Sequence, residues 1–287
     1  MIRIITDSMS DLTQQEAQAQ DFRVLPLTVR FGQEEFLDSV TLNHEAFYQR
    51  LATVKELPKT SQVTPRAFTQ AFQAELADPA NEVLCITGSS KLSGTFQSAM
   101  LARNSLPDPE RVHLLDSASV SMGEALLVRL ALVHRSTAKD AAALKATLEG
   151  YMLREHVIGK ADTLKYLVMG GRLSVLGGAV GSVLHIKPLL RIQEGALVQA
   201  GICRGSHRAM EWFVKQLEEH RPDPAVPMIL AHAHAPEVAS EMQAYITAHL
   251  AQLPPIMNLE IGTVVGTHGG PGIIGLAWVE VRSEERR

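Results

Sequence analysis

The sequence is poor in several residue types that mark specialised proteins. It has 2 cysteines in 287 residues, Cys85 and Cys203, and their spacing fits no zinc motif. Such sparse cysteine excludes a disulfide-stapled scaffold and is typical of a cytoplasmic protein with buried thiols. Lys and Arg number 27 against 31 Asp and Glu, a net charge of −4, so the charge balance gives no reason to expect a nucleic-acid partner.

Long apolar runs are also missing. No stretch approaches the ~20 apolar residues of a membrane span. The first residues, MIRIITD, read as a strand and a turn rather than as the apolar part of a signal peptide. At 46% hydrophobic residues, the composition is that of a soluble globular protein with a sizeable core.

Strand-like and helix-like segments alternate through the first half. The apolar runs predict strands at residues 2–6, 24–31, 83–87 and 112–116, the second continuing as a hairpin to residue 37. The helical patterns between and after them cover residues 44–52, 65–77, 94–104, 119–134 and 139–156. This alternation predicts an α/β fold with a mostly parallel sheet flanked by helices.

The second half of the sequence has a different order of strand-like and helix-like segments, which predicts a mixed sheet. We expect a hairpin of residues 188–192 and 197–202, followed by helices at 206–220 and 236–250 and by strands at 228–233, 261–265 and 273–281. The glycine-rich segment 177–181 is expected to pack closely, and 284–287 is expected to form a solvated tail. We predict two α/β domains, 1–158 and 159–287.

The segment 89–95, SSKLSGT, stands between a predicted strand and a predicted helix. Free backbone N–H groups at a helix N-terminus attract anions, and neighbouring hydroxyls complete such a site. The sequence has no GxxxxGK[ST] motif, so the expected anion is not a nucleotide phosphate. Ser93 and Gly94 are the expected contacts, although Ser93 could equally cap its own helix.

A second hydroxyl-rich turn, Thr60 and Ser61, precedes the helix start at Thr64 and Pro65. Its hydroxyls could bind a ligand or only cap the helix. If both turns follow strands of one parallel sheet, they meet at its carboxyl edge, where α/β proteins bind ligands.

Histidines supply the remaining candidates. His268 lies in the segment 266–272, GTHGGPG, which we expect to be a constrained loop after a strand, and a histidine there can donate a hydrogen bond to a carboxylate. His232 and His234 form an HxH pair on one strand face, as in zinc hydrolases, but no HExxH motif or third ligand accompanies them. Asp11 is expected to cap a helix beginning near Thr13.

These motifs together resemble the DegV family, and the resemblance covers residues 2–281. The residues that carry it are ITDS at 5–8, TSQ at 60–62, the 89–95 turn followed by FQSA, DS at 116–117, GGR at 170–172, IKP at 186–188 and HGGPG at 268–272. Two departures, Val63 in place of proline and Cys203 before Arg204, fall outside the expected head-group residues.

The resemblance implies a two-domain protein that binds a long-chain fatty acid such as palmitate, without a metal or other cofactor. It places the carboxylate on Thr60 or Ser61, on Ser93 with the Gly94 backbone, and on His268. Arg172 and Arg204 are the positions expected near the head group or a partner, although a solvated turn is the ordinary place for an arginine.

The resemblance further implies a carrier subunit rather than an enzyme. Such a subunit presents the acid to a separate ATP-dependent fatty acid kinase, then carries the acyl phosphate for phospholipid metabolism, with transient contact to a membrane surface. Two alternatives stay open: a metal-dependent hydrolase using His232, His234 and His268, and a regulatory module whose lipid occupancy changes its affinity for a protein partner.

Overall fold

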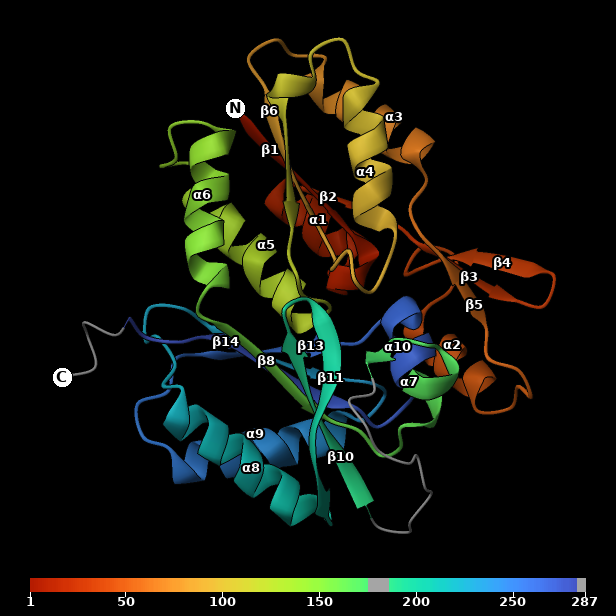
Figure 1. Cartoon of the computed structure of the whole chain (residues 1–287), viewed down its shortest axis with the longest axis vertical. Coiled ribbons are helices and arrows are strands. Elements are labelled where there is room, and N and C mark those ends of the chain that lie inside the picture. Colours follow the sequence, from red (N-terminus) through yellow and green to blue (C-terminus); the bar gives the residue numbers. More distant parts are fainter. Residues whose placement is uncertain (175–185, 283–287) are drawn as a thin grey trace.

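The computed structural model describes residues 1–174 and 186–282, so the segments 177–181 and 284–287 lie outside these ranges (Figure 1). Its first layer is a parallel sheet of four strands in the order β2-β1-β6-β7. The strands are β1 Ile2–Asp7, β2 Arg23–Leu25, β6 Glu82–Thr87 and β7 Val112–Asp116. This sheet confirms the parallel arrangement predicted for the first half of the chain.

Helices cover both faces of this sheet. In Figure 1, α3 and α4 lie on one side of it and α5 and α6 on the other. The helices of this half are α1 Gln14–Gln20, α2 His44–Leu51, α3 Pro65–Leu76, α4 Thr95–Asn104, α5 Met122–His134 and α6 Ala141–Met152. α3 begins as predicted, with Pro65 in its first turn and the Thr64 hydroxyl accepting a hydrogen bond from the N–H of Ala67.

The second layer is a mixed sheet of seven strands in the order β13-β12-β14-β8-β10-β11-β9. Its strands are β8 Glu155–Lys160, β9 Leu173–Ser174, β10 Ile186–Gln193, β11 Ala196–Arg204, β12 Met228–His232, β13 Ile256–Glu260 and β14 Ile274–Val279. Helices α8 Ser206–Glu219 and α9 Pro236–His249 bury their apolar faces in a second core cluster on this sheet. Helix α5 contacts strands of both sheets and so lies between them (Figure 1).

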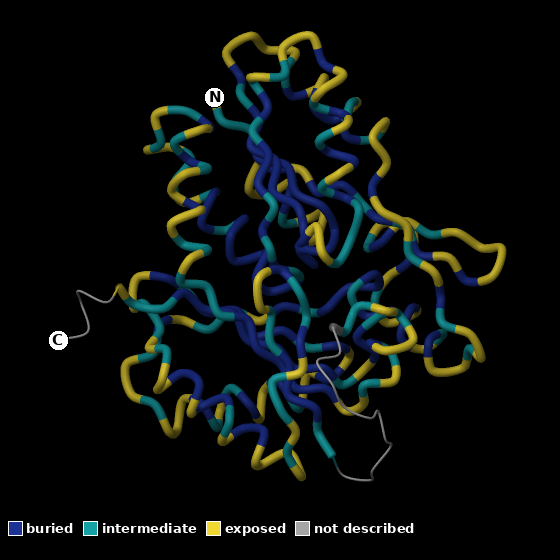
Figure 2. The backbone as a smooth tube through the Cα atoms, in the orientation of Figure 1, coloured by how far each residue is buried: buried dark blue, intermediate teal, exposed yellow. Residues whose placement is uncertain are grey.

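A small antiparallel sheet, β4-β3-β5, projects beside the two layers. Its strands are β3 Thr28–Phe31, β4 Glu34–Leu37 and β5 Lys59–Ser61, and it lies near the short helices α7 Lys165–Met169 and α10 Thr263–Gly269. Figure 2 shows the buried residues concentrated in the strands and the exposed ones on the outer faces of the helices. No helix in the described ranges is both long and apolar enough to cross a membrane.

Three predicted elements were wrong in their extent or type. The run 24–31 is not one strand, because Pro26 has no N–H to donate and separates β2 from β3, which belong to different sheets. The predicted helix 139–156 ends at Met152, since Val157 and Ile158 are buried in the sheet as part of β8. The predicted strand 261–265 is the start of α10 instead.

The predicted division between residues 158 and 159 falls within β8, which pairs antiparallel with both β14 and β10. A division drawn between the two large sheets would therefore precede Glu155. The two-domain description stays a prediction.

Candidate functional site

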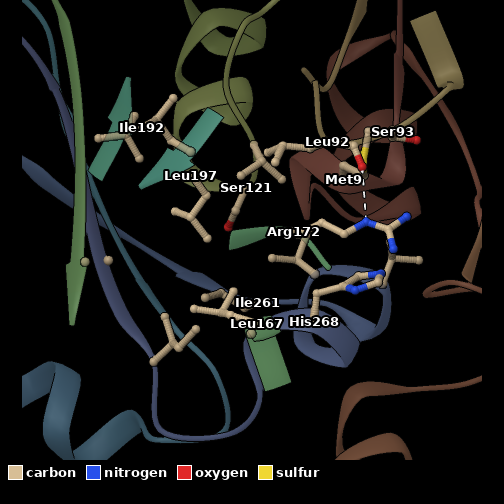
Figure 3. Close-up of a pocket in the computed structure, with 18 of the residues that line it drawn as sticks. Met9, Leu92, Ser93, Ser121, Leu167, Arg172, Ile192, Leu197, Ile261 and His268 are labelled. Carbon is tan, nitrogen blue, oxygen red and sulfur yellow. Dashed lines mark hydrogen bonds between the residues drawn. The ribbon is translucent and has the colours of Figure 1, made fainter. Parts of the chain in front are cut away.

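A cavity of about 430 Å³ lies at the carboxyl edge of the parallel sheet, above the seven-stranded sheet. Most of its lining is aliphatic, and Figure 3 shows Ile192 and Leu197 at one end of it and Ile261 beside Leu167 nearer to His268. Other apolar lining residues come from the segment after β1, from α5, β8, β10 and α7, and include Met9, Val120, Met122, Val157, Leu190 and Leu167. A pocket of this size and lining suits an apolar small molecule.

Polar groups gather at the other end of the cavity. There the side chains of Ser93, Arg172 and His268 lie close together (Figure 3), and Thr60, Ser61 and Gln62 also line the cavity. The cavity thus pairs a long apolar wall with a small polar end. Thr60, Ser61, Ser93, Gly94, Arg172 and His268, all named from the sequence, are brought together here.

Thr60 and His268 are joined directly. The Thr60 hydroxyl lies 2.9 Å from Nε2 of His268. Burial, with a smaller effect from the nearby Arg172 cation, lowers the pKa of His268 to about 4, so the imidazole is neutral at pH 7. Within the described chain, its buried Nδ1 has no hydrogen-bond partner. The two hydroxyl turns were expected to meet because both would follow strands of one parallel sheet. They do line the same cavity, but Thr60 lies in β5 of the small antiparallel sheet, so that reason was wrong.

The turn between β6 and α4 is built around Gly94. A Cβ at this position would overlap the amide end of the Gln62 side chain, so a larger residue here would have to displace that side chain. Gln62 in turn donates from Nε2 to the Ser98 hydroxyl on α4 at 2.7 Å. The Ser93 hydroxyl lies 2.9 Å from that of Thr95 and accepts weakly from the Thr95 N–H at 3.3 Å, while Gly94 occupies the N-cap.

The serines at the start of this turn have structural roles. Ser89 donates from its hydroxyl to the carbonyl of Gly195 at 2.6 Å, which ties the turn to the β10–β11 hairpin. The N–H of Ser90 donates to the carboxylate of Asp116. Neither serine is among the described residues that line the cavity.

Arg172 brings a positive charge to the polar end. Its Nη1 donates to the carbonyl of Gly170 at 2.7 Å and its Nε donates to the carbonyl of Leu92 at 3.3 Å, as the dashed line in Figure 3 marks. Among the described residues, no carboxylate forms an ion pair with this guanidinium. A part-buried cation held by carbonyl groups favours an anion as its neighbour. Arg204, at the end of β11, is exposed and is absent from the described lining.

Helix α10 carries His268 and is fixed by two buried aspartates, of which Asp11 but not Asp38 was singled out from the sequence. The Asp11 carboxylate accepts from the N–H of Gly262 at 2.9 Å, and Asp38 accepts from the N–H of Thr263 at 3.1 Å and from its hydroxyl at 2.7 Å. Burial raises the pKa of Asp11.

The prediction that Asp11 caps the helix near Thr13 was wrong, because Thr13 and Glu16 form a capping box by themselves.

The histidines of the hydrolase alternative do not come together. His268 lines the cavity, whereas His232 ends β12 and His234 stacks on Tyr48 with ring centroids 5.2 Å apart. In the part of the chain that the structure describes, none of the three belongs to a group of at least three side chains with metal-ligand spacing. The metal-dependent hydrolase is therefore not supported by the geometry.

Comparisons with known proteins agree with this architecture. The family model described as "Uncharacterised protein, DegV family" matches residues 1–281. A DegV domain-containing protein of Caldanaerobacter subterraneus is 30% identical over 280 residues, covering 97% of this chain and 99% of the relative. Another from Deinococcus radiodurans is 31% identical over 278 residues, or 96% and 97% of the two chains.

Solved structures with the same fold hold lipids. A DegV family protein from Thermus thermophilus, described as binding fatty acid, superposes with a TM-score of 0.88 at 28% identity, covering 98% of this chain and 99% of its own. A protein from Thermotoga maritima, described as revealing a fatty acid binding function, gives 0.84 at 26% identity with the same coverage. With a family model that spans both sheets and the cavity between them, the chain belongs to the DegV family.

Proposed function

We propose that this protein is a carrier of long-chain fatty acids. The observation that supports this most directly is the shape of the cavity: an aliphatic chamber that ends at a neutral histidine, two hydroxyl turns and an arginine without a carboxylate partner. The acyl chain would occupy the aliphatic part. Its carboxylate would accept hydrogen bonds from Thr60 or Ser61, from Ser93 and the Gly94 backbone, and from His268.

The acyl chain would supply most of the binding free energy, and the contacts of the head group would fix the orientation of the acid. A 16-carbon acid has roughly 14 methylenes, and burying each gains about 0.8 kcal/mol, or about 11 kcal/mol in all. Lost translational and rotational freedom offsets at least ~4 kcal/mol of this. Neutral hydroxyls and an imidazole are less costly to bury than further charges, so they can orient a carboxylate without a large desolvation penalty.

We also propose that a separate ATP-dependent kinase phosphorylates the bound acid. A carboxylate oxygen would attack the γ-phosphorus of ATP, ADP would leave, and the carrier would retain the acyl phosphate. The head group then becomes more negative, from a charge of about −1 for the carboxylate towards −2 for the acyl phosphate. Arg172 at the cavity and the exposed Arg204 are the cations proposed to meet that charge or the partner's surface. The carrier would act in the cytoplasm and contact membrane surfaces transiently.

Native mass spectrometry of the purified full chain tests the fatty-acid proposal. We expect one acyl chain per protein, its removal by organic extraction, and rebinding of palmitate to the delipidated protein. Protein that carries no acyl chain and binds no labelled palmitate would overturn the proposal. Acyl phosphate trapped as a hydroxamate, only when kinase, ATP and loaded carrier are all present, tests the kinase step separately.

A further inference from the structure

A group of side chains with metal-ligand chemistry lies away from the cavity, where β8 begins and α8 and β14 end. It consists of His156 on β8, His220 directly after α8, and Glu280 directly after β14. One ligand atom from each of the three lies within 4.8 Å of the others. None of the three is among the described residues that line the cavity.

The spacing within this group matches that of metal ligands. Nε2 of His156 lies 2.9 Å from one oxygen of Glu280, and Nδ1 of His220 lies 3.5 Å from the other. Ligands about 2.0–2.1 Å from a tetrahedral zinc ion are ~3.3 Å from one another. The two imidazole rings stack with centroids 4.2 Å apart and planes 26° apart. Because an imidazole binds a metal in the plane of its ring, a shared ion requires the His220 ring, which is 40% exposed, to turn towards His156 and Glu280.

The supporting structure holds the three side chains in place. The ring of Trp278 stacks on His156 at 5.1 Å, and its indole N–H donates to the carbonyl of His220 at 2.7 Å. The N–H of Glu280 donates to the carbonyl of Arg154, next to the start of β8. A metal site gains affinity when neighbouring groups fix its ligands in this way.

The local charge also suits a cation. The guanidinium of Arg154 pairs with Asp223 at 3.3 Å while donating to the main-chain carbonyl of Glu280. Glu280 contributes the negative charge of its carboxylate to the cluster.

From this geometry we infer that His156, His220 and Glu280 form a site for a zinc-type divalent ion. Two imidazoles and one carboxylate suit zinc, whereas magnesium prefers oxygen ligands throughout. Three protein ligands leave a fourth position for water. The ion would link the end of α8 to β8 and β14, the strands that also carry the cavity residues Ile158 and Gly275. This inference is independent of the proposed lipid function.

The test uses the full chain without a histidine tag, after treatment with a chelator. Titration calorimetry with ZnCl₂ is expected to show one ion per chain, and saturating Zn²⁺ is expected to raise the Tm by about 5 °C at a hundredfold excess over the dissociation constant. MgCl₂ at the same concentration is expected to change nothing. Failure of Zn²⁺ to bind at one ion per chain, or an equal rise with Mg²⁺, would overturn the inference.

Two variants locate the ion. His220→Ala removes a ligand that is 40% exposed, and Glu280→Gln keeps the size of the side chain while removing its charge. Each is expected to weaken Zn²⁺ binding by about 100-fold or more. The matched control is His207→Ala, which removes a histidine from an exposed two-residue pair with Glu211 at 3.3 Å. Unchanged affinity in His220→Ala and Glu280→Gln, or an equal loss in His207→Ala, would contradict the assignment.

Discussion

The hydroxyl of Thr60 and Nε2 of His268 lie 2.9 Å apart although 208 residues separate them in the sequence. One belongs to a strand of the small antiparallel sheet and the other to a short helix in the second half of the chain. Their contact closes the polar end of the cavity. A ligand head group held there would therefore lie against residues from both halves of the sequence.

Thr60→Val tests the role of this hydroxyl with little change of shape. Loss of one or two hydrogen bonds of about 1 kcal/mol each predicts a 5- to 30-fold weaker affinity for palmitate, measured by titration of the delipidated protein. The matched control is Thr147→Val on the exposed face of α6, far from the cavity, which is expected to leave affinity unchanged. Equal affinities in wild type and Thr60→Val would remove Thr60 from the site.

His268 predicts a defined pH dependence of stability. Its pKa is about 4 in the folded protein and 6.5 in an unfolded chain, so the folded state resists protonation. Stability from this residue is complete above pH 6.5 and decreases as the pH falls towards 4, by roughly 3 kcal/mol. Urea denaturation of wild type and His268→Gln at several pH values measures this difference.

The comparison with His268→Gln is needed because buried carboxyls titrate in the same range, among them Asp7, whose pKa burial raises to about 7. Such groups are common to both proteins and cancel in the difference. A difference in unfolding free energy that stays constant between pH 7 and pH 4 would show that His268 is not held neutral.

Two glycine substitutions should have opposite effects. Gly94→Ala places a methyl group against the amide end of Gln62, which must give up its hydrogen bond to Ser98, and we expect palmitate affinity to fall about fivefold, the equivalent of one hydrogen bond. Gly150→Ala adds a methyl group to open space on helix α6 and should stabilise the protein by about 0.5–1 kcal/mol without affecting binding. Thermal unfolding and palmitate titration of both variants check this pair, and unimpaired binding in Gly94→Ala would contradict the close fit.

Substitutions of Arg172 and Arg204 should affect fatty-acid binding and acyl phosphate formation separately. Arg172→Ala removes the cation at the polar end of the cavity and is expected to lower palmitate affinity about tenfold, while hexadecanol, which has no charge, binds as before. Arg204→Ala changes an exposed side chain outside the described lining, so palmitate affinity should be unchanged while acyl phosphate formation with the kinase decreases. Loss of affinity for palmitate and hexadecanol alike in Arg172→Ala would indicate a packing role.

Local patterns predicted most of the elements because each depends on nearby residues. The Thr64–Pro65 helix start, the β3–β4 and β10–β11 hairpins and the strand–turn–helix around Ser93 all follow from propensity and turn chemistry. The residues proposed for the head group were singled out from hydroxyl-rich turns, a glycine-rich segment and family motifs, and the structure brings all of them except Arg204 to one cavity.

The failed strand prediction at residues 261–265 has a long-range physical cause. Residues 261–265 are rich in Val and Ile and read as a strand, yet Asp11 and Asp38, more than 220 positions away, bind the free N–H groups of a helix start there. Long-range hydrogen bonds of this kind override local β-propensity and leave no periodic signal in the sequence. The apolar wall of the cavity could not be distinguished from ordinary core either, because tertiary packing decides which aliphatic side chains line a cavity.

The cavity has a consequence for the protein without its ligand. An empty, dry space of 430 Å³ would cost about 10 kcal/mol at roughly 24 cal/mol per Å³, which is comparable to the entire stability of a typical domain, about 5–15 kcal/mol. The unloaded chain must therefore admit water among aliphatic side chains or contract around the void. In either case a bound acyl chain would complete the hydrophobic core, and its release would remove part of the protein's interior.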